Sequence, residues 1–243
     1  MCGRFAVTLP PEAVRAFFAY AEHPNFPPRY NIAPTQPIPL VTAQAHTGGR
    51  ERHFLLARWG FLPAFVKNPR EFPLIVNARA ETLAHKPSFR AALKRRRCLV
   101  IADGFYEWRR EAPGASKAAA KTPFLIRRVD QAPMGFAGLM ETWSDPSGGE
   151  IDTACIITIT ANRLMTRVHD RMPAILSPEA FSLWLDNDGV EARTATALLR
   201  PAPEAALELI PIGPAVNRVA NDDAAVQAPI GEAIRAALAE KAR

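Results

Sequence analysis

Short apolar segments, each bounded by turn residues, run along most of this 243-residue chain. They are rich in Val, Ile, Leu and Phe, and each is short enough to be a single strand. They read RFAVT, IPLVTA, HFLLARW, PLIVNA, RCLVIA, PFLIRRV, GFAGLM and ACIITIT. This pattern predicts a fold dominated by β-structure, with most of the apolar side chains buried on sheet faces.

Helical patterns are fewer. PPEAVRAFFAY starts with prolines and places Val14, Phe17 and Phe18 on one face. SFRAALKRR predicts a helix capped by Ser88, whose end, Lys94 to Arg97, we expect to be solvated. Two further helices are predicted from the sequences SPEAFSLWLD, with Ser177 as cap, Pro178 in the first turn and Phe181, Trp184 and Leu185 inward, and GEAIRAALAEKAR at the C-terminus.

The strands do not alternate regularly with helices, which argues against a doubly wound α/β sheet. We therefore expect one α+β domain over residues 1–225, followed by a helical tail at residues 226–243. Its centre is predicted to be a mixed, mostly antiparallel sheet curled into a barrel-like core with peripheral helices. The segment EAPGASKAAAKT is predicted to be an exposed loop between two strands.

Charge and cysteine content limit the classes of function. The formal net charge is +6, which favours an anionic partner. Cys2, Cys98 and Cys155 are odd in number and lack zinc-site spacing, so neither a disulfide framework nor a metal or other cofactor is predicted.

No apolar run resembles a signal peptide or a membrane span, and we expect a cytoplasmic monomer.

The N-terminal sequence MCGRF places a cysteine at the second position. Methionine followed by a small residue is the usual substrate for co-translational methionine removal. Loss of Met1 would leave Cys2 with a thiol and a free α-amine on one residue. The alternative is that Cys2 is simply the first residue of a strand, and the N-terminus alone does not decide between them.

Polar residues interrupt two of the predicted strands. In LIVNARAET, the period of two places Asn77, Arg79 and Glu81 on one face, which fits either a surface strand or the floor of a polar site. In CLVIADGFYEW, Glu107 lies between two aromatic residues at a strand end. Desolvation there would favour its protonated form and suit a general acid, although pairing with an arginine is an equal alternative.

A third polar stretch, HDRMP, follows the last long strand. His169 is flanked by Asp170 and Arg171 and stands close to a proline-fixed turn. A lone histidine is more often structural than catalytic, but this setting is also usual for a site residue.

Taken together, these stretches resemble the SOS response-associated peptidase (SRAP) family, whose members process abasic sites. The matching segments occur in the family's order and extend from Cys2 to about Asn217. They read MCGRF, RYNIAPTQ, RWGFLP, NARAET, FR, RRCLVIADGFYEW, FAGLMETW, TANRLM, HDRMPAIL and AVN. The visible departures are the Ala/Lys-rich insert near residue 115 and the C-terminal tail.

The resemblance implies a chemical use for Cys2. A terminal 1,2-aminothiol condenses with aldehydes to a thiazolidine, and an abasic site in DNA has an open-chain aldehyde form. The expected partner is therefore single-stranded DNA that contains abasic sites. Asn77 is expected to orient the Cys2 amine or the sugar, Glu107 to act as general acid and base, and His169 to stabilise or protonate the sugar oxygen.

The resemblance also implies the DNA contacts. Arg4, Arg79 and Arg171 are expected as phosphate ligands, because guanidinium groups match phosphate oxygens. Trp108 and Trp59 are expected to stack on exposed bases.

Two other classes of function are consistent with part of the sequence. An N-terminal-nucleophile amidohydrolase also begins Met-Cys-Gly, but it does not require GFYEW or HDRMP. A non-catalytic basic DNA-binding module would bind in a salt-sensitive way that is unaffected by Cys2→Ala. The peptidase of the family name describes either self-removal of Met1 or cleavage of other peptides.

Overall fold

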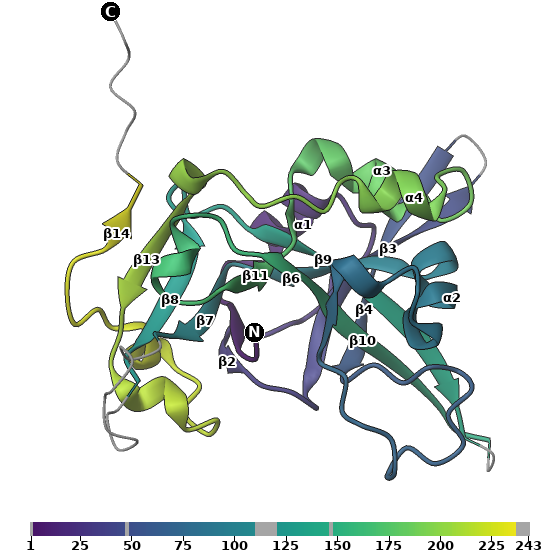
Figure 1. Cartoon of the computed structure of the whole chain (residues 1–243), viewed down its shortest axis with the longest axis horizontal. Helices are drawn as coiled ribbons and strands as arrows, with labels where there is room; N and C mark the ends of the chain where they lie inside the picture. Colours follow the sequence, from purple (N-terminus) through teal and green to yellow (C-terminus); the bar gives the residue numbers. More distant parts are fainter. Residues whose placement is uncertain (1, 47–48, 110–120, 146–147, 237–243) are drawn as a thin grey trace, which may run out of the picture.

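The first of two sheets carries the N-terminal strand at its interior. A computed structural model of the protein describes residues 2–46, 49–109, 121–145 and 148–236 (Figure 1). All pairings in this six-stranded sheet are antiparallel. Its strands, in spatial order, are β14 (Ile234–Arg235), β13 (Leu207–Pro211), β8 (Pro123–Arg128), β7 (Gly104–Trp108), β1 (Phe5–Val7) and β2 (Arg29–Ile32).

The second sheet closes on itself. Its ring runs through β10 (Glu150–Thr160), β4 (Gly49–Trp59), β3 (Pro37–His46), β6 (Arg97–Ala102) and β9 (Met134–Ser144), which pairs again with β10. Three short strands attach to this ring: β5 (Asn77–Arg79), β11 (Arg171–Pro173) and β12 (Ile175–Leu176). Only the pairings of β10 with β4 and β5 are parallel among the described strands. The predicted α+β fold with a curled, mostly antiparallel sheet is confirmed.

The helices are short and lie outside the ring. In α1 (Pro11–Phe18), Val14 and Phe18 are buried as the spacing predicts. Helix α3 (Phe181–Leu185) buries Phe181, Trp184 and Leu185, also as predicted, after a 3₁₀ turn, η3 (Pro178–Ala180). The remaining turns and helix are η1 (Ala80–Thr82), η2 (Met165–Arg167), α4 (Ala192–Thr196), η4 (Glu204–Ala206), η5 (Pro214–Asn217) and η6 (Ala224–Gln227).

One predicted helix cap and one predicted helix are wrong. Helix α2 (Pro87–Arg95) begins with Pro87 at its first turn and is preceded by Lys86, so Ser88 is inside the helix rather than its cap. The segment predicted to be a C-terminal helix forms the strand β14 in its described part, because pairing with β13 overrides the local helical preference. Residues 237–243 of that segment, like most of the predicted loop EAPGASKAAAKT, lie outside the described residues.

The main core fills the space between the two sheets. Phe5 of β1 lies edge-on to Trp59 of β4 and to Phe136 of β9, at 5.1 and 6.3 Å between ring centroids. Cys98 and Cys155 are fully buried, as expected for cysteines in apolar strands. Through Phe5, β1 packs against the second sheet, while its backbone pairs within the first sheet.

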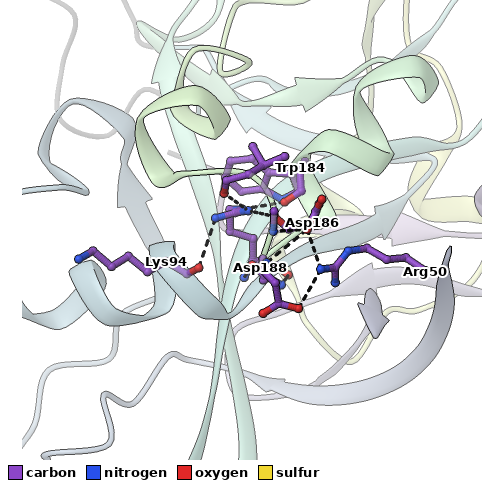
Figure 2. Close-up of polar contacts among 9 residues, drawn as sticks. Arg50, Lys94, Trp184, Asp186 and Asp188 are labelled. Carbon is purple, nitrogen blue, oxygen red and sulfur yellow. Dashed lines mark hydrogen bonds and ion pairs between the residues drawn. The ribbon is translucent and has the colours of Figure 1, made fainter. Parts of the chain in front are cut away.

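Arg97 departs from its predicted solvation, because its side chain is completely buried. Its guanidinium donates to the backbone oxygens of Trp184 and Leu93 at 2.7 and 2.8 Å, and further bonds reach Asp186 and Val190. Figure 2 shows the resulting cluster, in which Arg50 reaches Asp186 and Asp188 from the other side. Desolvation lowers the pKa of Arg97, and the carbonyl oxygens compensate for the lost water.

Replacing Arg97 by Lys should destabilise the fold. Lysine keeps the charge but lacks the planar fork that reaches several carbonyl oxygens, so we expect the free energy of unfolding to fall by about 2–4 kcal/mol. Urea unfolding followed by circular dichroism measures this change. Arg96→Lys is the matched control, because Arg96 is half exposed and should change stability by less than about 0.5 kcal/mol. Equal effects of the two variants would contradict a bracing role for Arg97.

Candidate functional site

The site begins where β1 meets β7. Phe5 is paired with Phe105 and Ala6 with Gly104, and the pairing is extended by the N–H of Tyr106, which donates to the Arg4 oxygen at 3.0 Å. This antiparallel register brings the residues before Arg4 beside the far end of β7. The start of the chain therefore lies in the middle of the molecule, close to β2 and β7 (Figure 1).

Cys2 has no exposed surface. Its backbone oxygen accepts a hydrogen bond of 2.8 Å from Asn77 Nδ2, and its thiol points toward the Arg4 oxygen at 3.7 Å. Burial, followed by the negative charge of Glu107, raises the pKa of the Cys2 thiol far above its ordinary value. The thiol therefore stays protonated near neutral pH, and any attack by its sulfur requires a base.

Asn77 is brought to Cys2 by strand pairing. It is the first residue of β5, which pairs in parallel with β10 so that Asn77 lies opposite Ile156. While Nδ2 holds the Cys2 oxygen, Oδ1 is buried and accepts no hydrogen bond from the part of the chain that the structure describes. A bound hydroxyl or amine would satisfy this oxygen.

Glu107 lies inside β7, one residue before its end, and its side chain is almost completely buried. The sequence predicted a strand end after the apolar run, but β6 and β7 are separate strands joined at Asp103. Asp103 accepts hydrogen bonds from the backbone of Thr8 and Leu9, and burial raises its pKa. Glu107 is the carboxylate whose charge raises the pKa of the Cys2 thiol. Asp103 instead holds the backbone that follows β1.

His169 follows the 3₁₀ turn η2 and precedes β11. Its side chain is 10% exposed, and Nδ1 lies 2.9 Å from both the Arg171 backbone nitrogen and Asp170 Oδ1. The Arg171 N–H donates to Nδ1, and the Asp170 carboxylate lies at the same nitrogen, where it would pair with a protonated ring. Two neighbouring protein groups therefore hold the orientation of the ring.

The three arginines predicted to bind phosphate have different surroundings. Arg4 donates from Nη1 to Asn31 Oδ1 and to the Val216 oxygen, both at 2.7 Å. Arg171 holds both carboxylate oxygens of Glu81, at 2.6 and 3.0 Å, and this hydrogen-bonded pair lowers the pKa of Glu81. The prediction that Glu81 continues the strand is wrong, because β5 ends at Arg79 and Glu81 lies in η1.

Arg79 is the exposed member of the three. It shares a face of β5 with Asn77, as the period of two predicts, and both line a groove of about 320 Å³. Lys86 adds a second cation to this groove, a contribution that its place just before α2 in the sequence did not indicate. The complete lining is Leu74, Ile75, Val76, Asn77, Arg79, Thr82, Lys86, Ser88 and Phe89.

The two tryptophans differ in exposure. Trp59 has no exposed surface, donates from Nε1 to the Val76 oxygen at 2.9 Å and packs on Phe5, so the predicted stacking of Trp59 on a base is wrong. Its ring instead fills the core beneath the N-terminal strand. Trp108 is half-buried and donates from Nε1 to Asn217 Oδ1 at 2.7 Å, which leaves ring surface accessible beside Glu107.

The described residues therefore bring Cys2, which precedes β1, together with Asn77 of β5 and Glu107 of β7. Within those residues, no group of three or more His, Cys, Asp or Glu side chains is placed to hold a metal ion. No helix in the described ranges is long and apolar enough to cross a membrane. The arrangement offers a buried thiol, an amide, a carboxylate and an adjacent basic groove.

Comparisons with known proteins match most of the chain to one family. The sequence profile of the family described as SOS response associated peptidase (SRAP) matches residues 1–219. The abasic site processing protein YoqW of Bacillus subtilis (strain 168) is 34% identical over 225 residues, covering 91% of this chain and 96% of that protein. The abasic site processing protein HMCES of Gallus gallus is 32% identical over 270 residues, covering 95% of this chain and 78% of that protein.

Solved structures resemble this fold over most of its length. A crystal structure of a protein from Bacteroides thetaiotaomicron matches with a TM-score of 0.79 at 25% identity, covering 93% of this chain and 98% of that one. A phage-related protein from Bordetella bronchiseptica matches with a TM-score of 0.68 at 30% identity, covering 87% and 94% of the two chains.

Proposed function

The chain belongs to the SOS response associated peptidase family, and from that premise we propose that it processes abasic sites in single-stranded DNA. In this proposal Cys2, freed of Met1, forms a covalent thiazolidine with the deoxyribose aldehyde. The observation that carries the proposal is the hydrogen bond from Asn77 to Cys2, which places Cys2 next to a residue that lines the basic groove. The names of the relatives YoqW and HMCES, both abasic site processing proteins, support the substrate class.

The first step uses the α-amine of Cys2. Removal of Met1 converts an amide nitrogen, which cannot form an imine, into an amine with an ordinary pKa of roughly 7.7–8.0. Its lone pair attacks the aldehyde carbon, and the carbinolamine loses water to give an imine. Asn77 Oδ1, buried and available, is proposed to accept an amine hydrogen and so to aim the lone pair.

The second step closes the ring. The sulfur of Cys2 adds to the imine carbon, the thiol loses its proton, and the imine nitrogen gains one, so that a five-membered thiazolidine results. Because burial keeps the thiol protonated, this step depends on a base, and Glu107 is the carboxylate whose charge reaches the sulfur. His169 is proposed to donate from Nε2 to the sugar oxygen as the ring of the deoxyribose opens.

The basic groove beside Asn77 is proposed to hold the phosphate backbone. Arg79 and Lys86 supply cations there, and Trp108 presents ring surface for base stacking. Arg4 and Arg171 already bind protein groups through their guanidinium nitrogens, so we assign them mainly to placing the strands of the site. The proposed partner is therefore single-stranded DNA that crosses the exposed face of β5.

The proposal also covers the peptidase of the family name. Release of Met1 by its neighbour Cys2 would be a hydrolysis at the same residue, and reversal of the crosslink would be a lyase-like step. An amidohydrolase needs an activated sulfur as its first nucleophile. The raised pKa of the Cys2 thiol instead favours a mechanism in which the amine attacks first.

Cys2 variants test the covalent step. The mature protein should lack Met1 by intact-mass spectrometry and should form a heat-stable adduct with single-stranded DNA that contains one abasic site, seen on a denaturing gel. Cys2→Ser should lose the thiazolidine but keep a weaker, borohydride-reducible imine. Cys98→Ala is the matched control, because that thiol is equally buried in the core and should leave crosslinking unchanged. An undiminished stable adduct with Cys2→Ala would mean that another nucleophile reacts.

Glu107→Gln separates catalysis from DNA capture. The amide keeps the shape of the carboxyl group but cannot transfer the protons, so adduct formation and reversal should slow by roughly 10²–10⁴-fold. The affinity for DNA, measured by fluorescence anisotropy with undamaged single strands, should stay nearly constant. Loss of DNA binding with an unchanged rate per bound complex would assign Glu107 a structural role.

Arg79→Ala should reduce binding through the phosphate backbone. Removing one phosphate contact should weaken binding to all sequences and lower the slope of log affinity against log salt by about 0.7 for single-stranded DNA. Titrations of undamaged single strands from low to high salt measure this slope. Arg90→Ala is the control, since Arg90 is an exposed cation on α2 outside the groove lining. Equal slopes for wild type and Arg79→Ala would mean that the phosphate backbone of the DNA binds outside this groove.

A further inference from the structure

A buried amide in β2 connects the N-terminal strand to a segment near the end of the chain. Asn31 has no exposed surface, and its Nδ2 donates to the backbone oxygens of Val216, Arg218 and Asn221 at 3.2, 3.0 and 2.7 Å. These oxygens belong to residues 214–222, which we call the brace segment. The proposed chemistry does not use Asn31 directly, and its three hydrogen bonds to the brace segment indicate a different role.

One end of this network reaches Cys2. Asn31 Oδ1 accepts from Arg4 Nη1 at 2.7 Å, and Arg4 also donates to the Val216 and Asn217 oxygens at 2.7 and 3.4 Å. Arg4 is two residues from Cys2, and its own backbone oxygen is the acceptor nearest the Cys2 thiol. Fixing the side chain of Arg4 therefore fixes the backbone that carries the thiol and the α-amine.

The other end of the network reaches Trp108, the residue that follows Glu107 in β7. Asn217, in the brace segment, accepts a hydrogen bond of 2.7 Å at Oδ1 from Trp108 Nε1. The brace segment thus bonds the side chain of Arg4, just before β1, and that of Trp108, the neighbour of Glu107 in β7.

The brace segment is itself fastened to β2. The carboxylate of Asp222 accepts from the backbone nitrogens of Tyr30 and Asn31, the latter at 2.8 Å, and pairs with Arg29. Within the segment, Asn221 Nδ2 donates to the Ala215 oxygen at 2.8 Å. A segment bonded at both ends and to the amide between them has little freedom to shift.

We infer that Asn31 is a positioning residue that sets the separation between Cys2 and Glu107 through Arg4 and the brace segment. This inference rests on the proposed function, in which proton transfer from the thiol requires these groups within hydrogen-bond reach. Displacement of a reacting group by about 1 Å can cost on the order of 10²-fold in rate. Asn31 therefore acts on the rate of the covalent step and not on the binding of DNA.

Two variants loosen the network at different points. Asn31→Leu removes the amide from the buried centre, while Asn217→Ala removes the acceptor of Trp108 from an exposed position and leaves the core intact. Asn217→Asp keeps that acceptor and is the conservative rescue. Asn187→Leu is the matched control, since Asn187 makes reciprocal amide bonds with the backbone of Arg97.

The test is single-turnover crosslinking to abasic single-stranded DNA over a range of protein concentrations. Asn31→Leu and Asn217→Ala should lower the maximal rate constant by roughly 10- to 100-fold, with an unchanged half-saturating concentration and full final amplitude. Asn217→Asp should restore the rate, and Asn187→Leu should match wild type. A merely structural role would lower the amplitude through loss of folded protein at a constant rate, and that result would overturn the inference.

A second substrate distinguishes this inference from the proposed function. Glyoxylate, a small aldehyde without phosphate, should react with the Cys2 aminothiol to give a product of defined mass. If wild type fails to crosslink abasic DNA, the proposed function fails, yet slower glyoxylate reaction of Asn31→Leu and Asn217→Ala than of wild type would still support the positioning role. Equal glyoxylate rates in all variants would overturn it, whatever the result with DNA.

Discussion

The antiparallel pairing of β1 with β7 brings the N-terminal residues beside Glu107 and so places two of the candidate site residues. Because β1 is an interior strand, the chain terminus is drawn into the molecule instead of fraying at the surface. Hydrogen bonding from Tyr106 to Arg4 extends the register so that Cys2 faces the end of β7. The parallel pairing of β5 with β10 then brings Asn77 to the same place. The site is a junction of strands, and sheet register fixes its geometry.

Burial of Cys2 has a chemical consequence that follows from desolvation. A thiol without water around it and with a carboxylate nearby remains protonated, so its sulfur is a poor nucleophile until a base removes the proton. An α-amine, by contrast, has an ordinary pKa of roughly 7.7–8.0, which leaves an appreciable neutral fraction near neutral pH. The proposed order, in which nitrogen attacks first and sulfur second, agrees with this difference.

The arginines around the site divide into those bound by the protein and one that faces solvent. Arg4 binds Asn31 of β2, and Arg171 of β11 binds Glu81 of η1, so each guanidinium adds a polar contact between neighbouring elements. Arg97 does the same for α3 on the other side of the ring. Arg79 has the exposure that a phosphate ligand requires. Since guanidinium groups suit carbonyl, carboxylate and phosphate oxygens alike, residue type alone does not separate these roles.

The sequence by itself determined the strand-rich character, the cysteine at position 2 and the alternation that puts Asn77 and Arg79 on one face, because these depend on local composition and the period of two. Only the tertiary structure decided that Trp59 and Arg97 are buried, and that the C-terminal segment pairs as β14. Burial depends on which distant strand covers a face, and pairing with β13 outweighs a local helical preference. Neither is encoded within one short segment.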